Sequence, residues 1–142
     1  YEKITVEGTK RLIDGLADFE VEQFVFASTM LVHKPTASPT ERITEDSPIG
    51  PSWAYPESKV RTEAVLRARH GRIPVVFLRI AGVYSDDGRS PFLAEQIARI
   101  YEHQLTSHFY PGMLCAAQSF IHRDDLADAV LKLVDRRRAL PA

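Results

Sequence analysis

The chain has 142 residues, of which 44% are hydrophobic and 26% charged, with a formal net charge of −1 at pH 7. This composition is ordinary for one globular domain, and the near-neutral charge gives no electrostatic reason to expect nucleic acid or an anionic membrane as a partner. No apolar run approaches the roughly 20 residues that a membrane-spanning helix needs, nothing at the N-terminus resembles a signal peptide, and the single Cys115 excludes an internal disulfide. We therefore expect a cytoplasmic protein without nucleic-acid or membrane partners.

The first third of the chain predicts a helix, a buried strand and a long loop. Residues 2–17 carry apolar side chains at near-helical spacing, with charged side chains between them, and form an amphipathic helix. Residues 21–29 are apolar and rich in residues that favour strands, as in a buried parallel strand. Residues 32–51 contain four prolines, which leave no room for regular structure.

A second helix and a second buried strand follow. The helix covers residues 52–70, with Ser52 as its N-cap and Pro56 in the first turn, where a missing N–H costs least. Gly71 ends the helix in the way that glycine commonly does after the last helical residue. Residues 73–80 are again continuously apolar and predict the second strand.

The last part of the chain predicts less regular structure. Residues 81–90 read as a loop, residues 91–103 as a helix, and residues 118–122 as a short strand. Asp124 or Asp125 caps a final helix, and the arginines at its end complement the helix dipole.

The alternation of helices with apolar strands predicts an α/β fold with a parallel sheet. Right-handed crossovers place the loops after both strands at the same edge of that sheet. Ligands bind at this edge in open α/β sheets. Thr29, the helix that begins near Tyr55, and Gly82 should therefore converge there.

Tyr55 and Lys59 are four residues apart, so on a helix they lie on one face, one turn apart. An ammonium group beside a phenol favours the phenolate and lowers the pKa of the phenol from roughly 10. Such a phenol can give a proton to, or take one from, a carbinol or carbonyl oxygen. Taken alone, the pair is also compatible with a surface tyrosine beside a solvated lysine, because short motifs arise by accident.

The order of four segments carries a resemblance to a known family: Phe24–Val32, Tyr55-x-x-x-Lys59, Leu78-Arg79-x-x-x-Val83-Tyr84 and Phe120–Ala127. This order resembles the extended short-chain dehydrogenase/reductase superfamily, in its NAD-dependent epimerase/dehydratase branch. The resemblance implies the C-terminal part of a Rossmann-type doubly wound parallel sheet with helices on its faces. Residues 1–85 would form the nicotinamide-side half of an NAD(P)-binding domain. Residues 86–142 would form a substrate-side segment that returns to the sheet and ends in a helix.

The resemblance also implies roles for individual residues. Thr29 matches the active-site Ser/Thr, whose hydroxyl would hydrogen-bond the reacting oxygen, with Ser28 as the less suitable candidate. Tyr55 would be the general acid/base, and Lys59 would lower its pKa and hold the ribose hydroxyls of NAD or NADP. The cofactor would also lie along the backbone of three residues at the strand ends: Ala27, Ile80 and Ala81. The implied reaction is hydride transfer by an epimerase, dehydratase or reductase, on a sugar nucleotide or a related carbonyl or carbinol compound.

The chain departs from the family's pattern in three places. No two glycines have G-x-G or G-x-x-G spacing, so the phosphate-binding turn is missing. The resemblance places Tyr1 after that turn, with about 90 residues missing if each βαβ unit takes roughly 30, and we expect the 142 residues alone to bind NAD poorly. Gly82 stands where sugar-nucleotide members usually carry an Asn, and His33 where they usually carry a Tyr.

A catalytically silent relative, a binding or regulatory module that keeps the fold, is the alternative to an enzyme, because fold does not fix function. The presence of Thr29, Tyr55 and Lys59 together favours the enzyme. A homodimer through residues 2–17 and 52–70 is expected from the apolar positions on both helices. The five histidines show no pairing at helical spacing, so no metal site is expected.

Overall fold

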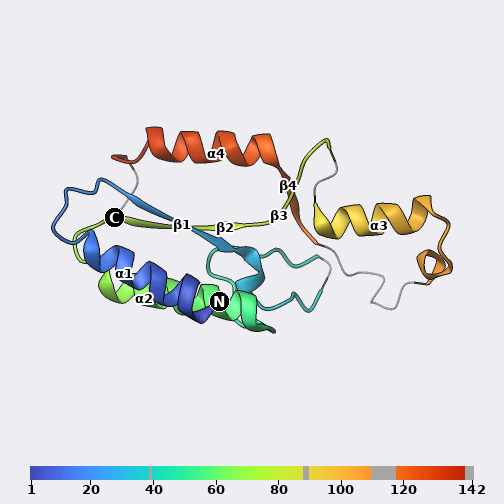
Figure 1. Cartoon of the computed structure of the whole chain (residues 1–142), viewed down its shortest axis with the longest axis horizontal. Helices are drawn as coiled ribbons and strands as arrows, with labels where there is room; N and C mark the ends of the chain where they lie inside the picture. The colour runs from blue at the N-terminus through green and yellow to red at the C-terminus, as the bar shows by residue number, and fades with distance from the viewer. Residues whose placement is uncertain (39, 88–89, 110–117, 140–142) are drawn as a thin grey trace.

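The computed structural model describes residues 1–38, 40–87, 90–109 and 118–139. Its elements in chain order are the π-helix η1 (Glu2–Val6), α1 (Glu7–Gly15), β1 (Phe24–Thr29), the 3₁₀ helix η2 (Met30–Val32), α2 (Ala54–Arg69), β2 (Val75–Ile80), β3 (Gly82–Tyr84), α3 (Pro91–Tyr101), the 3₁₀ helix η3 (Leu105–His108), β4 (Phe120–His122) and α4 (Arg123–Asp135). Figure 1 shows α1 and α2 side by side on one side of the β1–β2 pair, with α4 on the other side. Helices thus lie on both sides of a parallel pair of strands, as the sequence predicts.

The strands β1 and β2 are parallel and in register from Phe24 opposite Val75 to Thr29 opposite Ile80. Both strands were expected from their apolar sequence, and each begins two or three residues later than predicted. Pro74 cannot donate to a ladder and precedes β2, but its carbonyl accepts from the Phe24 amide at 2.8 Å. Because the two strands pair along their whole lengths, their carboxyl ends lie side by side at one edge of the sheet.

The core lies between the two N-terminal helices and the strands. It contains Ile13 of α1, Phe26 of β1, Leu66 of α2 and Ile73, which precedes β2. Not all the apolar positions expected to face inward do so, because Ile4 and Leu12 keep 83% and 53% of their exposure. The amphipathic pattern of residues 2–17 therefore predicts the helix correctly but only part of its buried face.

The buried face of α2 differs from the one that its apolar residues suggest. Ala64 and Ala68 are exposed, whereas Ser58 and Thr62 are buried. The two hydroxyls can be buried because the helix's own carbonyls accept from them, Ser58 Oγ to Tyr55 O at 2.6 Å and Thr62 Oγ1 to Ser58 O at 2.8 Å. A hydroxyl that is satisfied in this way loses little by leaving water.

The ends of α2 confirm one prediction and correct another. Gly71 has a φ of +58°, the left-handed conformation that favours glycine after a helix. Ser52 is not the N-cap; Trp53 occupies that position in an extended conformation, without a side-chain hydrogen bond to the helix. Pro56 lies in the first turn as expected, and its missing N–H leaves one donor fewer to satisfy there.

The loop predicted for residues 81–90 contains a strand that sequence reasoning missed. β3 pairs in parallel with β4, from Gly82 opposite Phe120 to Tyr84 opposite His122, and only Ala81 separates β3 from β2. A side chain at Gly82 would meet the Phe120 ring, because a Cβ built there lies 2.7 Å from it. The short strand predicted within residues 118–122 is present.

The final helix begins differently from the prediction. His122 is the N-cap of α4, and its Nδ1 accepts from the Asp124 amide at 3.3 Å. Asp124 and Asp125 therefore lie in the first turn rather than at the cap, because the chain passes from β4 directly into the helix. At the other end, Arg137 Nη1 donates to Val134 O at 3.0 Å, as the dipole argument predicts.

The arginines after α4 also reach the segment before β1. Arg137 and Arg138 both form ion pairs with Glu22. These hydrogen bonds lower the pKa of the Glu22 carboxyl from 4.5 to about 2. The contact joins two parts of the chain that are 115 residues apart and ties the end of α4 to the strand layer.

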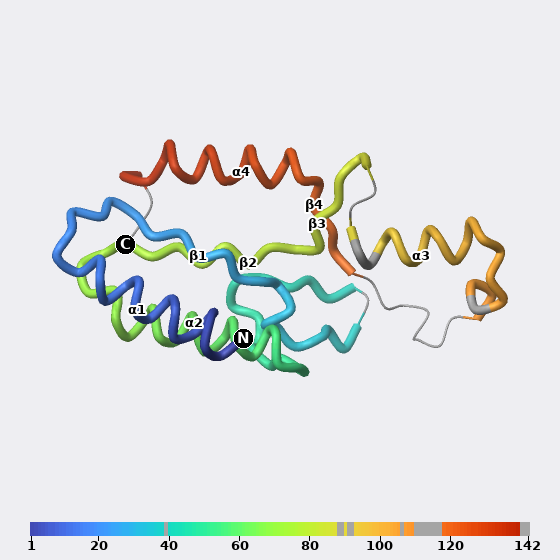
Figure 2. The backbone as a smooth tube through the Cα atoms, viewed as in Figure 1, coloured from blue at the N-terminus to red at the C-terminus, as the bar shows by residue number. Residues whose placement is uncertain are grey.

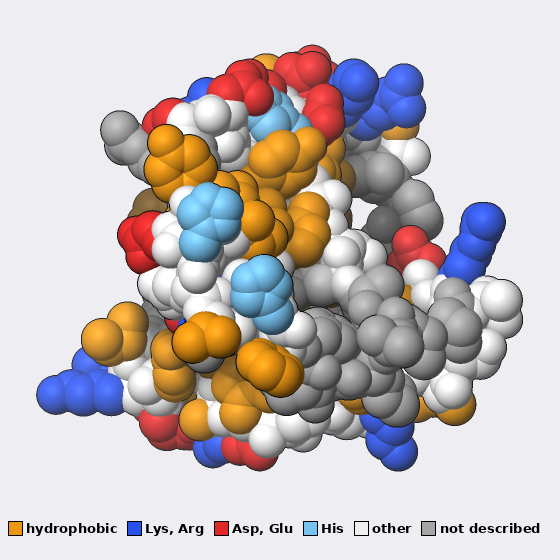
Figure 3. Space-filling model, turned by 90° about the vertical axis from the view of Figure 1, so that its right-hand side faces the viewer, with side chains coloured by type: hydrophobic (Ala, Val, Ile, Leu, Met, Phe, Trp, Pro, Cys, Tyr) orange, Lys and Arg blue, Asp and Glu red, His pale blue; other side chains and the backbone are white. Residues whose placement is uncertain are grey.

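Helix α3 and η3 form one end of the molecule, away from the β1–β2 pair (Figure 2). Their large apolar side chains are exposed: Ile97, Ile100, Tyr101, Leu105 and, just beyond η3, Phe109. Figure 3 looks at this end and shows hydrophobic and histidine side chains in the middle of the face, with charged side chains toward its margin. Cys115 lies outside the described residues. In the part of the chain that the structure describes, no helix is both long and apolar enough to span a membrane.

Candidate active site

The carboxyl ends of β1 and β2 bring together the residues that the sequence placed at one sheet edge. Thr29 is the last residue of β1 and is buried, and it lies opposite Ile80, the last residue of β2. Ala81 follows Ile80, and Ala27 lies two residues before Thr29 on the same strand. The Thr29 Oγ1 accepts from the Leu31 amide at 3.3 Å, which caps η2.

Tyr55 and Lys59 lie one turn apart at the start of α2, as their spacing predicts. The Lys59 Nζ donates to the Ala27 carbonyl at 2.7 Å and lies 5.8 Å from the centre of the Tyr55 ring. It also lies over the Phe26 ring, 4.9 Å from its centre. The ammonium group therefore joins the acid/base candidate on the helix to the strand that ends in Thr29.

The surroundings of this pair are partly closed to solvent. Lys59 is half-buried, and this burial lowers the pKa of its ammonium group from the ordinary value. Tyr55 is also half-buried, and the Tyr1 ring packs against it with 5.6 Å between the ring centres. The Thr29 hydroxyl hydrogen-bonds to the Leu31 amide, and Lys59 reaches the same strand two residues earlier, at the Ala27 carbonyl.

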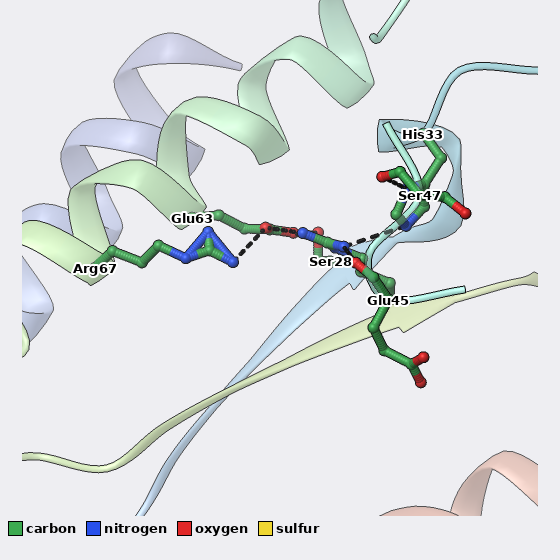
Figure 4. A network of polar contacts seen from close by, with 7 residues as sticks. Ser28, His33, Glu45, Ser47, Glu63 and Arg67 are labelled. Atoms are coloured by element: carbon green, nitrogen blue, oxygen red, sulfur yellow. Dashed lines mark hydrogen bonds and ion pairs between the residues drawn. The ribbon is translucent and has the colours of Figure 1, made fainter. Parts of the chain in front are cut away.

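A second cluster, which sequence reasoning missed, begins at Ser28, the residue before Thr29, and includes Glu63 of α2 (Figure 4). Ser28 Oγ donates to Glu63 Oε1 at 2.6 Å. The Arg79 guanidinium binds the same carboxylate through two donors, Nε to Oε1 at 3.1 Å and Nη2 to Oε2 at 2.7 Å. The two-pronged geometry is the one in which a guanidinium binds a carboxylate most strongly.

The electrostatics of this cluster fix its charge state. Burial alone would raise the pKa of Glu63, whose side chain is only 4% exposed. The hydrogen bonds from Arg79 and Ser28 outweigh burial, so the pKa of Glu63 lies below its ordinary value. The hydrogen bond to Glu63 in turn raises the pKa of Arg79. Each partner therefore favours the ionised form of the other.

Two signals in the sequence could have revealed this cluster. Glu63 lies four residues after Lys59 and eight after Tyr55, so the helix presents all three on one face. Arg79 is a charged residue within an otherwise apolar strand, and a buried charge needs a partner. Ser28, which the sequence makes a less suitable active-site hydroxyl than Thr29, donates its hydroxyl hydrogen to the Glu63 carboxylate.

No group of three or more His, Cys, Asp or Glu side chains gathers as metal ligands among the described residues.

The family model for the NAD dependent epimerase/dehydratase family matches residues 1–142. Comparison with curated proteins gave no match.

Several solved structures share the fold. UDP-glucuronic acid 4-epimerase from Bacillus cereus, in complex with UDP-glucuronic acid and NAD, is 21% identical with a TM-score of 0.77 over 94% of this chain and 42% of its own. dTDP-glucose 4,6-dehydratase from Bacillus anthracis, in complex with NAD, is 20% identical with a TM-score of 0.75 over 92% of this chain and 42% of its own. A short-chain dehydrogenase/reductase superfamily protein from Agrobacterium tumefaciens with bound NAD is 24% identical with a TM-score of 0.69 over 93% of this chain and 49% of its own. The chain thus spans less than half the length of these structures, and the likeness confirms the expected fold class, part of a Rossmann-type α/β sheet.

Proposed function

The chain belongs to the NAD-dependent epimerase/dehydratase family, and on that premise we propose that its gene product is an NAD- or NADP-dependent epimerase or dehydratase that works by hydride transfer. The observation that carries this proposal is the Lys59 ammonium group, which lies between the Tyr55 ring and the Ala27 carbonyl at the strand ends. The proposed substrate is a sugar nucleotide or a related carbonyl or carbinol compound. Support for this class comes from structural neighbours whose names specify UDP-glucuronic acid and dTDP-glucose.

The residues at the strand ends fit the nicotinamide end of a dinucleotide. An ammonium group has three N–H donors; Lys59 uses one on Ala27 O and can offer the others to ribose hydroxyls. The backbone of Ala27, Ile80 and Ala81 lies at the edge where open α/β sheets bind dinucleotides. None of the seven glycines has the spacing of a pyrophosphate-binding turn, so the fit is limited to this end of the cofactor.

The three side chains can share the chemistry at the substrate oxygen. The nicotinamide, when bound, supplies or accepts the hydride. Tyr55 would donate the proton to the oxygen, or remove it, depending on the direction of the reaction. Lys59 would stabilise the phenolate form through its positive charge. Thr29 accepts from the Leu31 amide, which leaves its own O–H free to donate to the same oxygen.

The activity test uses the full-length gene product with NAD and a set of UDP- and dTDP-hexoses. We expect Tyr55→Phe to lower kcat by about 10²- to 10⁴-fold, the usual range for the loss of a general acid/base, while the NAD dissociation constant changes less than threefold or so. Tyr101→Phe is the matched control, because this tyrosine is on α3 and 84% exposed. Equal loss in both variants, or no loss in Tyr55→Phe, would refute the assignment.

The catalytically silent alternative predicts a different result. A binding or regulatory module would bind NAD without turning over any of the sugar nucleotides, aldehydes or ketones offered to it. The same titration and assay therefore separate the two functions. The cytoplasmic location remains a prediction, which cell fractionation can test.

We also propose that the gene product is a homodimer through residues 2–17 and 52–70. Ile4 and Leu12 are exposed on η1 and α1, which pack beside α2, and Trp53 is exposed where α2 begins. Exposed apolar groups of this kind on two adjacent helices favour burial against a second copy. Light scattering should report twice the monomer mass, and Ile4→Glu should lower it; a monomeric mass for the unaltered protein would refute the dimer.

A further inference from the structure

The segment that follows the active-site strand forms a loop with a closed neck. The loop comprises residues 34–50, of which residue 39 lies outside the described part. At its neck the Lys34 amide donates to Pro48 O and the Gly50 amide donates to Val32 O, both at 2.9 Å. His33 and Ile49 pair across the neck as an antiparallel bridge. The loop leaves the sheet only a few residues after Thr29.

Arg79 reaches this loop from β2, the strand that pairs with β1. Its Nη1 lies 3.2 Å from Glu45 O and 3.2 Å from the Nε2 of His33. The other ring nitrogen of His33, Nδ1, lies 2.9 Å from Ser47 O. One guanidinium group and one buried imidazole thus contact the loop at two carbonyls.

The hydrogen-bonding capacities of these partners fix the state of His33. A guanidinium group only donates and a backbone carbonyl only accepts. His33 must therefore accept at Nε2 and donate at Nδ1, which is the neutral imidazole with its proton on Nδ1. The tautomer can be measured independently of any activity.

Glu63 anchors Arg79 at its other side. The carboxylate takes two bonds from Arg79 and one from Ser28, the residue before Thr29. It belongs to the helix that carries Tyr55 and Lys59. The remaining charged neighbour, Arg67 of the same helix, lies 3.5 Å from Glu63 and is largely exposed. Glu63 and Arg79 therefore connect the strand end, the acid/base helix and the loop.

We propose that Arg79 is a positioning residue, which holds the loop of residues 34–50 at the strand ends through His33 and Glu45 while Glu63 holds Arg79. Its consequence for catalysis rests on the function proposed above. Because the loop follows so closely on Thr29, the residue proposed to meet the substrate oxygen, displacing the loop affects the substrate rather than the NAD. Arg79 itself need not touch either molecule.

The decisive variant is Arg79→Lys in the full-length gene product. A lysine keeps the positive charge near Glu63, but its single ammonium group cannot bind Glu63 in two places and also reach His33 and Glu45. We expect the Lys34 and Gly50 amides to exchange hydrogen about tenfold faster or more, since loss of hydrogen bonds to a charged group frees the neck to open. The His33 ring should lose its fixed tautomer in nitrogen-15 NMR.

Arg69→Lys provides the matched control. Arg69 also binds a carboxylate, with its Nη1 2.8 and 2.9 Å from the two oxygens of Asp14, but this pair is exposed and joins α2 to α1. Its substitution should leave the exchange rates within twofold and the His33 signals unchanged. If Arg79→Lys fails to fold, His33→Gln leaves the Glu63–Arg79 pair in place and should open the neck by itself.

The kinetic readout separates positioning from general stability. Arg79→Lys should raise the substrate KM about tenfold and leave the NAD dissociation constant within twofold, whereas a partly unfolded enzyme would lose NAD binding in proportion. Unchanged exchange and an unchanged His33 tautomer in Arg79→Lys would overturn the proposal, as would equal changes in Arg69→Lys. Absence of turnover in the unaltered protein would refute the proposed function alone, because the exchange and tautomer measurements would still decide the role of Arg79.

Discussion

Removal of either partner of the Glu63–Arg79 pair should destabilise the protein strongly, and removal of both should cost much less than the sum. The perturbations are Glu63→Leu, Arg79→Met and the double variant, in which two apolar side chains of similar size replace the charges. Glu63 retains 4% and Arg79 17% of side-chain exposure, so water screens the pair only weakly. Glu63→Leu leaves the Arg79 guanidinium without its carboxylate, whereas Arg79→Met leaves Glu63 with only the Ser28 hydroxyl and the largely exposed Arg67 at 3.5 Å.

The burial of Glu63 and Arg79 and their hydrogen bonds set how much free energy of unfolding each variant loses. Breaking a buried pair by removing one partner costs about 3–5 kcal/mol, and the residual exposure of Arg79 places Arg79→Met near the lower end. Glu63→Leu also leaves the Ser28 hydroxyl without its acceptor, which adds about 1–2 kcal/mol. Replacing a whole pair by apolar groups is often close to neutral, so the double variant should cost only about 1–2 kcal/mol, chiefly for the unpaired Ser28 hydroxyl. That is roughly 5 kcal/mol less than the sum of the two single variants.

Urea denaturation of the full-length protein, followed by circular dichroism, measures the four free energies of unfolding in this cycle. The control cycle removes Asp14 and Arg69, which are both about half exposed and should show a coupling below about 1 kcal/mol. If the costs of Glu63→Leu and Arg79→Met add to within about 0.5 kcal/mol, the pair is not coupled and the reasoning fails.

The same pair predicts how stability changes with acid. The pKa of Glu63 is lower in the folded protein than the ordinary 4.5, so the folded state favours the ionised carboxylate. Its contribution to stability is therefore complete above pH 4.5 and is lost as the pH falls through the folded pKa. Glu63→Gln should reduce this acid-dependent part of the unfolding curve.

Three further predictions concern the scaffold. Leu66→Ala should cost about 2–5 kcal/mol because this side chain is fully buried in the core, whereas Leu131→Ala on the exposed side of α4 should stay within about 0.5 kcal/mol in the same urea assay. Gly71→Ala should cost about 1–2 kcal/mol because its φ is +58°, and Gly15→Ala, where a Cβ meets nothing within 4 Å, should instead stabilise by about 0.5 kcal/mol; equal effects would contradict the backbone argument. Glu22 should titrate near pH 2 by NMR and return toward 4.5 when the two arginines after α4 are replaced by alanine; a normal titration in the unaltered protein would refute that contact.

The sequence predicts those parts of this fold in which one physical signal dominates over several residues. The strands β1 and β2 are runs of apolar residues, and the Gly71 helix end has a residue type suited to its backbone. The Tyr55–Lys59 spacing predicts a shared helix face, which the structure confirms. The roles of these two residues and of Thr29 in a reaction remain predictions.

The predictions from the sequence fail where the local structure depends on residues that are far away in the chain. β3 has three residues, too few to show a period, and its partner β4 begins 38 residues after Gly82. The N-caps of α2 and α4 were misassigned by one to three residues, because Trp53 and His122 take the position through the path of the chain rather than through residue preference. The role of Glu63 was missed because a glutamate in a helix is usually solvated. Its burial becomes favourable because Arg79 of β2 pairs with it.

The single residue between β2 and β3 suggests how new specificities could be built on this scaffold. One extended run, residues 75–84, exchanges β1 for β4 as its neighbour at Ala81. The chain therefore leaves β3 after Tyr84 and returns at Phe120 to its partner strand β4, and helix α3, which belongs to this part, lies away from the β1–β2 pair (Figure 2). We predict that a chimera that imports the segment between Tyr84 and Phe120 from another family member would preserve both strand pairs, so the proposed substrate side could be exchanged without altering the helix that carries Tyr55 and Lys59.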